Sequence, residues 1–276
     1  MSSGRVFLGE AEIAAPPLSH RGLAYGDGIF ETMRGYRGTL PWWDAHWRRA
    51  VRGAARLRLP MPSQGFAQAQ ALAACQDMDD GIVKLVFSRD GERGYAPLPD
   101  ATALWIVSAH PAPPQQVAGL HLRWCETRLA RQPLLAGIKH CNRLEQVLAR
   151  AEWSAAEASD RDADDGLLCD TDNRVICATA ANVFILHEGR WRTPALTHSG
   201  VAGVCREWVL HALAAREQAL SRHEVETAEA VFLCNAVRGI LPVARLAQRQ
   251  WPPHPAIDAA RKLLAQAHPA FAMEHT

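Results

Sequence analysis

The sequence predicts an α+β fold of two domains. Helical and strand-like patterns alternate through the first hundred residues, a Pro- and Gln-rich stretch at 110–119 breaks both patterns, and strands and helices resume after it. A chain of 276 residues is long enough for two moderate domains. We expect an N-terminal α+β domain over residues 1–109, a linker over 110–118 and a C-terminal α+β domain over 119–276.

Two helices followed by a pair of strands are expected between residues 44 and 112 of the N-terminal domain. Residues 44–59 repeat apolar side chains with a helical period, and Asp44 is placed to cap that helix. Residues 64–78 read as a second, Ala-rich helix. Residues 81–95 alternate and then turn at Asp90 and Gly91, and 101–112 form another strand-like run, so the two runs predict a hairpin or meander.

The C-terminal domain mixes strands with two helices. Strand-like runs are expected at 120–129, 164–170, 173–191 and 229–243, separated by turns. Residues 142–159 are strongly helical, and a small-residue turn at 200 runs into an amphipathic helix that reaches about 217.

Composition excludes several classes of function. A formal net charge of +1 provides no field to attract nucleic acid or an acidic membrane, so we expect a small molecule or another subunit as partner. No signal peptide and no spanning segment is evident, which favours the cytoplasm. Seven cysteines without a CxxC pair predict neither disulfides nor a zinc site, and the histidines lack HExxH-type spacing, so no metal is expected.

Lys139 stands out because lysine is scarce. Three of the 30 basic residues are lysine (Lys84, Lys139 and Lys262), and the remaining 27 are arginine. Lys139 lies between a small-residue turn and a helix, where a desolvated amine could form a Schiff base. A solvated surface lysine is the alternative, although arginine supplies surface charge in this chain.

Backbone N–H groups at the start of the helix near 204 could bind an anion. The segment GVAGVCRE (200–207) leads into that helix and suits a phosphate, although a plain helix start has the same pattern. An arginine from the helix at 44–59 could be a second phosphate ligand. Four candidates compete there, most of them belonging to a solvated face: Arg48, Arg49, Arg52 and Arg56.

Two loops carry candidate substrate ligands. The Gly-rich YGDGIFETMRG (25–35) predicts a tight turn entering a strand, with Thr32 and Arg34 beyond it. The segment GERGY (91–95) places Arg93 on a loop near Arg89, where a guanidinium could clamp a carboxylate through two hydrogen bonds, or simply face water. No GxSxG or comparable pattern supports a serine nucleophile.

Taken in order, these segments resemble the class IV (fold-type IV) pyridoxal-phosphate enzymes. The motifs are YGDGIFETMRG, DAHWRR, SRDGERGY, LAGIKHCNRLEQVLARAEW, TAANVFI, GVAGVCR and FLCNAVRGILPV, which span nearly the whole chain. The family includes branched-chain and D-amino acid transaminases and 4-amino-4-deoxychorismate lyase. The segments GIKHCNRLEQVLAR, GERGY and CNAVRGILPV look most like the lyase.

The resemblance implies a fold and a set of site residues. It implies the D-amino acid aminotransferase-like fold, a homodimer, and pyridoxal 5'-phosphate in a cleft between the domains, with the C-terminal pseudo-barrel carrying the lysine. Lys139 would hold the cofactor covalently, and Arg49 would bind its phosphate. The remaining implied cofactor ligands are backbone N–H groups of Val204, Cys205 and Ala236 at the phosphate, Val201 against the ring, and Asn235 beside the phosphate.

Substrate ligands follow from the same comparison. Arg93, and beside it Arg89 or Arg34, would hold substrate carboxylates, and Thr32 would place a hydroxyl near the reacting centre. The implied reaction converts 4-amino-4-deoxychorismate to 4-aminobenzoate and pyruvate for folate synthesis, with Lys139 as general base.

Cys177 departs from the family pattern. The family has a glutamate five residues before the position of Asn182, and that carboxylate pairs with the pyridine nitrogen. A neutral thiol at this position cannot hold the nitrogen protonated, so the ring is a weaker electron sink. We expect transamination to suffer most, because the lyase draws part of its driving force from an aromatic product.

Two other functions stay open. The chain could be a transaminase of D- or branched-chain amino acids. It could also be a relative that has lost catalysis and serves as a binding or scaffold protein, for which Cys177 is the sequence support.

Overall fold

The structure, a computed structural model, describes residues 4–114, 118–155 and 161–272. The chain divides into two compact units: residues 1–113 with 138–142, and residues 114–137 with 143–276. The first boundary lies near the expected linker, of which residues 115–117 fall outside the described residues. One difference concerns Ile138–Asn142, which includes Lys139 and groups with the first unit, whereas we expected the lysine in the C-terminal domain.

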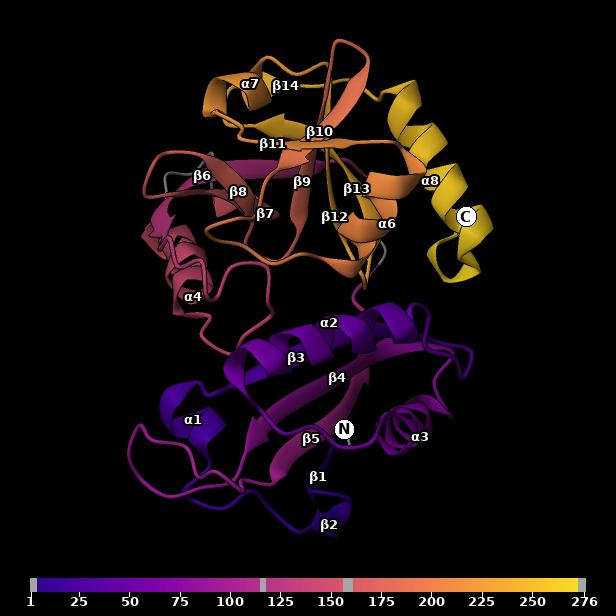
Figure 1. The fold of residues 1–276 in the computed structure, drawn as a ribbon. Coiled ribbons are helices and arrows are strands. Elements are labelled where there is room, and N and C mark those ends of the chain that lie inside the picture. Colours follow the sequence, from indigo (N-terminus) through magenta and orange to yellow (C-terminus); the bar gives the residue numbers. More distant parts are fainter. Residues whose placement is uncertain (1–3, 115–117, 156–160, 273–276) are drawn as a thin grey trace. The chain divides into compact units, whose positions relative to one another are not determined.

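The first unit is built on a five-stranded antiparallel sheet in the order β2-β1-β5-β4-β3 (Figure 1). The strands are β1 (Gly4–Leu8), β2 (Ala11–Ile13), β3 (Gly28–Tyr36), β4 (Asp80–Arg89) and β5 (Ala103–Pro111). The pairing of β4 with β5 confirms the predicted meander. A short helix, α1 (Arg21–Tyr25), precedes β3, and its C-cap is Gly26 in the left-handed conformation.

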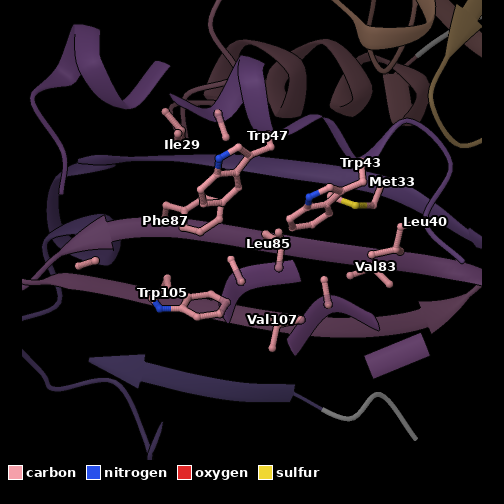
Figure 2. Packing of buried hydrophobic residues seen from close by; sticks show 14 of the residues in the cluster. Ile29, Met33, Leu40, Trp43, Trp47, Val83, Leu85, Phe87, Trp105 and Val107 are labelled. Carbon is pink, nitrogen blue, oxygen red and sulfur yellow. The ribbon is translucent and has the colours of Figure 1, made fainter. Parts of the chain in front are cut away.

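Two helices cover one face of this sheet. Helix α2 (Trp43–Leu57) packs on β3, and α3 (Gln64–Cys75) packs on β4 and β5 (Figure 1). Alternate strand residues, among them Met33, Leu85 and Trp105, belong to one buried apolar cluster that also includes Trp43 and Trp47 from α2 (Figure 2). The period-2 pattern of the strands therefore separates this core face from a second, half-buried face.

The prediction that Asp44 caps the first long helix is wrong. Helix α2 begins at Trp43, and its N-cap is Trp42, which adopts a left-handed conformation and makes no side-chain cap hydrogen bond. Asp44 lies within the first turn, where its carboxylate still interacts favourably with the positive end of the helix dipole.

The second unit contains a nine-stranded mixed sheet. Its order is β11-β10-β9-β12-β13-β6-β7-β8, with β14 paired to β13 (Figure 1). Strand β8 also contacts β9 and β10, so the sheet curls on itself. The strands are β6 (Leu120–Leu129), β7 (Asp165–Asp170), β8 (Val175–Ala178), β9 (Asn182–His187), β10 (Arg190–Pro194), β11 (Arg216–Gln218), β12 (Ala230–Asn235), β13 (Gly239–Leu246) and β14 (Arg249–Gln250).

The helices of this unit are shorter than the sequence predicts. The run at 142–159 gives α4 (Leu144–Ala151) and a 3-10 turn at Glu152–Ala155, and residues 156–160 fall outside the described part. Helix α6 (Val204–Ala212) ends before 217 because residues 216–218 pair with β10 as a strand. Helices α7 (Arg222–Glu226) and α8 (Pro255–Ala267) complete the unit. None of the described helices is long and apolar enough to cross a membrane.

Candidate active site

Lys139 is held against strand β3 by backbone hydrogen bonds. The N–H of Phe30 donates to the carbonyl of Lys139 (2.9 Å), and the N–H of Cys141 donates to the carbonyl of Gly28 (2.8 Å). The segment therefore extends the first sheet beyond β3, and Ile29 pairs with His140. The ammonium Nζ of Lys139 lies 4.3 Å from the centre of the Phe30 ring. This is a fixed, half-buried position for the amine.

Arg49 is part of a buried ionic cluster. His46 and Arg49 are three residues apart on α2 and therefore lie on one side of it, facing Glu31 on β3. The Nε of Arg49 donates to Glu31 Oε1 (2.9 Å) and its Nη2 donates to Oε2, while His46 Nδ1 lies 2.7 Å from Oε2. Arg49 is 5% exposed and Glu31 1%. One edge of the guanidinium, formed by Nε and Nη2, is thus fixed by one carboxylate.

The charges of this cluster follow from its contacts. Burial alone would raise the pKa of Glu31, but the charge and hydrogen bonds of Arg49, with the hydrogen bond from His46, lower that pKa to about 2. Burial lowers the pKa of His46, against the opposing effect of Glu31. Because an ionised carboxylate accepts only, the proton of the neutral imidazole lies on Nδ1. The cluster therefore holds Arg49 charged beside a neutral histidine.

The GERGY loop is fixed by a residue that the sequence analysis did not single out. Arg21, 3% exposed at the start of α1, donates to the carbonyls of Glu92 (3.2 Å), Gly94 (2.7 Å) and Tyr95 (3.2 Å). Its Nε also donates to Asp27 Oδ2 (2.9 Å). The carbonyl acceptors lie more than 70 residues away in the sequence, so no local signal could have revealed this role.

The three candidate substrate arginines differ in their surroundings. Arg93 is exposed on the loop held by Arg21. Arg89 is buried and donates to the carbonyls of Leu57 and Arg58 and to Asp27 Oδ1 (3.0 Å). Arg34 is also buried and pairs with the carboxylate of Asp80 through two nitrogens.

In the second unit, a loop leads into α6, whose first N–H groups have no acceptor within the helix. The first helical hydrogen bond runs from Glu207 N–H to the carbonyl of Gly203 (2.9 Å), so the N–H groups of Val204 and Cys205 precede it. The N-cap Gly203 offers no side-chain cap, and a Cβ there would overlap the side-chain oxygen of Asn182. This loop therefore requires glycine for close approach.

Val201 is fixed in the same loop. Asn182 Nδ2 donates to the carbonyl of Val201 (2.9 Å). Gly137 N–H donates to the carbonyl of Gly200 (2.9 Å), and Ala202 N–H donates to that of Gly137 (3.0 Å). The loop thus pairs with the chain two residues before Lys139. Asn182 belongs to the TAANVFI motif, so the sequence could have marked it as a candidate. Its hydrogen bond to Val201 could not be predicted, because the fold brings these two residues together.

Asn235 stabilises a turn rather than presenting a free side chain. Its Oδ1 accepts the N–H groups of Val237 (3.0 Å) and Arg238 (2.8 Å), and its Nδ2 donates to the carbonyl of Ala180. This turn sets the position of the backbone of Ala236, which is 9% exposed. The side chain of Cys205 is buried next to Cys234.

Cys177 lies on β8 and is buried in a cluster of apolar side chains that includes Leu168 and Ile176. Burial raises the pKa of its thiol to about 12. The nearby Arg143 lowers the pKa and Asp165 raises it, without reversing the effect of burial. The thiol is therefore neutral at any physiological pH, as we expected for a cysteine without a dominant cation beside it.

Known proteins similar to this chain match it over most of its length. The family model for amino-transferase class IV matches residues 28–246. Aminodeoxychorismate lyase of Vibrio harveyi is 35% identical over 83% of this chain and 86% of its own length. The crystal structure of 4-amino-4-deoxychorismate lyase from Pseudomonas aeruginosa is 37% identical, with a TM-score of 0.87 over 95% of this chain and 99% of that one.

A transaminase matches at lower identity. The branched-chain-amino-acid aminotransferase of Salmonella typhimurium is 26% identical over 82% of this chain and 78% of its own length. Because the family model spans most of the chain and the lyases match over nearly their full length, the chain belongs to the class IV aminotransferase family, with its fold-type IV architecture.

Proposed function

We propose that this protein is a pyridoxal-phosphate-dependent lyase that converts 4-amino-4-deoxychorismate to 4-aminobenzoate and pyruvate, a step of folate synthesis. The observation that carries the proposal is the match to lyases at 35% and 37% identity over nearly the whole of both chains. The branched-chain aminotransferase is 26% identical and matches over 78% of its own length.

The residues present fit pyridoxal 5'-phosphate. The N–H groups of Val204 and Cys205 at the start of α6 are donors for a phosphate, and the backbone of Ala236 is held by the Asn235 turn. Arg49 adds a fixed cation. Lys139 follows Gly137 by two residues, so the chain itself keeps the lysine within about 8 Å of that hydrogen-bonded loop.

Each of these residues would have a separate role in the reaction. When bound, the cofactor supplies an electron sink for the bonds next to the substrate's amine. The Nζ of Lys139 would hold the cofactor covalently and, once free, would accept a proton from the substrate ring as general base. Val201 would lie against the cofactor ring, and Cys177 would meet its nitrogen with a neutral thiol. Thr32 would place its hydroxyl near the reacting centre.

Arg93 is the favoured carboxylate ligand among the three arginines. It is exposed on a loop whose carbonyls are fixed by Arg21, so the loop is ordered while the guanidinium stays accessible. Arg89 and Arg34 are buried in pairs with Asp27 and Asp80, and we assign them the role of supporting the turn and the sheet.

We further infer that two copies of the chain associate through α4. Its residues Leu144, Val147 and Leu148 are 74%, 59% and 60% exposed and lie on one side of the helix, three and four residues apart. Leu134 is 71% exposed in the preceding segment. An exposed apolar stripe of this kind is typical of a surface that another subunit covers.

Transamination is the second candidate, supported by the 26% match to a branched-chain aminotransferase. Incubation of the purified protein with aminodeoxychorismate, and separately with amino donors and 2-oxo acids, separates the two. Pyruvate and 4-aminobenzoate should form in the first incubation. Amino transfer without pyruvate release would reject the lyase.

A further inference from the structure

The half-buried face of the first sheet carries a second lysine. Along β3, Phe30 and Thr32 lie on the face opposite the core, and along β4 Lys84 does the same. Lys84 is the direct cross-strand neighbour of Thr32. Side chains at such paired positions leave the sheet side by side on one face, so Thr32 and Lys84 are neighbours there.

Lys84 and Lys139 contact the same aromatic ring. The Nζ of Lys84 lies 5.3 Å from the centre of Phe30, and the Nζ of Lys139 lies 4.3 Å from it. Two of the three lysines of the chain therefore meet at one residue of β3. The charge of Lys84 therefore lies beside the ring that also borders the amine of Lys139, where it can attract an anionic group.

Within the described residues, Lys84 has no ion pair and no side-chain hydrogen bond, and it is half-buried. Its position differs from that of Arg34 and Arg89, whose guanidinium groups are paired with Asp80 and Asp27. The chain thus neutralises its buried arginines internally and keeps a lysine charge available next to Lys139. A compact ammonium on a flexible stem suits a small carboxylate.

We propose that Lys84 is a substrate-binding residue that holds a carboxylate of the substrate while Lys139 acts on the substrate's amine side. Thr32, its cross-strand neighbour, can donate a hydroxyl hydrogen bond to the same carboxylate. The inference rests on the proposed function, because that reaction supplies a substrate with two carboxylates.

The test compares wild type with Lys84→Met, Lys84→Arg and Lys262→Met. Lys84→Met should raise KM for aminodeoxychorismate by about tenfold to a hundredfold, the size of a hydrogen bond to a charged group, with a smaller change in kcat. Lys84→Arg should recover part of the loss. Lys262→Met, an exposed lysine on α8, should match wild type.

Calorimetric titration of the holoenzyme with the two products gives a readout independent of turnover. Lys84→Met should weaken the binding of 4-aminobenzoate if Lys84 holds the ring carboxylate. It should weaken the binding of pyruvate if Lys84 holds the other carboxylate. Aniline, which lacks the carboxylate, should bind wild type and variant alike. The visible absorption of the bound cofactor should not change.

Unchanged KM and unchanged binding of both products in a folded Lys84→Met variant would overturn the proposal. So would an unchanged KM with a shifted pH dependence of the cofactor absorption, since Lys84 would then act on Lys139 and not on substrate. A wild-type protein that releases no pyruvate would reject the lyase function itself. In that case carboxylate binding by wild type and Lys84→Met still decides the role of Lys84.

Discussion

Glu31 illustrates how a single buried carboxylate organises the site. It accepts hydrogen bonds from Arg49 and His46 and stays ionised although it is 1% exposed. A buried charge persists only when its partners compensate for lost hydration, so the geometry of Arg49 depends on Glu31. His46 Nε2 is buried without a hydrogen-bond partner among the described residues, which costs stability by about 1–3 kcal/mol.

Replacing Glu31 with glutamine should destabilise the protein in a pH-dependent way. The folded pKa of about 2 lies below the ordinary value of 4.5, so the stabilisation is present above pH 4.5 and is lost as the pH falls toward 2. Glu31→Gln should lower the free energy of unfolding by about 3 kcal/mol near pH 7. Urea unfolding at pH 7, 5 and 3 measures the difference.

Glu92 is the matched control, because its carboxylate is exposed and loses no hydration on folding. Glu92→Gln should leave the free energy of unfolding within about 0.5 kcal/mol of wild type. A Glu31→Gln effect of equal size at every pH would contradict the account of the ionised cluster.

In the proposed site, Cys177 would set the strength of the electron sink. Its thiol is neutral because burial raises its pKa to about 12. Cys177→Glu should raise the rate of amino transfer relative to pyruvate release by roughly tenfold, the size of one charge-assisted hydrogen bond. Cys177→Ser, which stays neutral, should keep the wild-type ratio; equal ratios in both variants would show that Cys177 does not face the cofactor nitrogen.

At the scale of elements, the 92–95 loop depends on Arg21 rather than on its own sequence. Arg21→Met removes three hydrogen bonds to loop carbonyls, so the loop should open more often. Trypsin cleavage after Arg93 should accelerate about tenfold, as measured by limited proteolysis and mass spectrometry.

Arg190→Met, at an exposed position on β10, is the control and should not change cleavage after Arg93. The same rate in Arg21→Met as in wild type would show that other contacts hold the loop.

Helix α4 should determine the oligomeric state. Val147→Glu places a charge in the exposed apolar stripe, which should shift the protein from dimer to monomer in sedimentation analysis. Leu263→Glu, at a 44% exposed position on α8, should leave the dimer intact. A dimer that survives Val147→Glu would place the interface elsewhere.

The sequence predicts elements better than it predicts contacts. Alternation along 81–95 up to the turn at Asp90, and the strand-like run at 101–112, predicted β4 and β5, because such patterns are visible locally. The helix expected to reach 217 ended early because residues 216–218 pair with β10, a tertiary effect. The contacts of Glu31 with Arg49 and of Arg21 with the 92–95 loop join distant segments, so no local pattern could reveal them.

At the scale of the whole molecule, the residues that the family resemblance assigns to the cofactor are distributed over both units of the chain. The first holds Lys139 and Arg49, and the second holds the α6 loop and Cys177. The match to the family model covers residues 28–246 and therefore includes parts of both units. The ordered motifs allowed this assignment from sequence, because their residue types and their order along the chain are visible without the fold.

Borohydride reduction of the purified protein, followed by peptide mass spectrometry, tests the central claim most directly. Reduction fixes a cofactor held through a lysine amine as a stable adduct. We expect a phosphopyridoxyl group on the peptide containing Lys139 and none on Lys84 or Lys262. An adduct on either of those lysines, or no adduct on a folded protein supplied with pyridoxal phosphate, would contradict this claim.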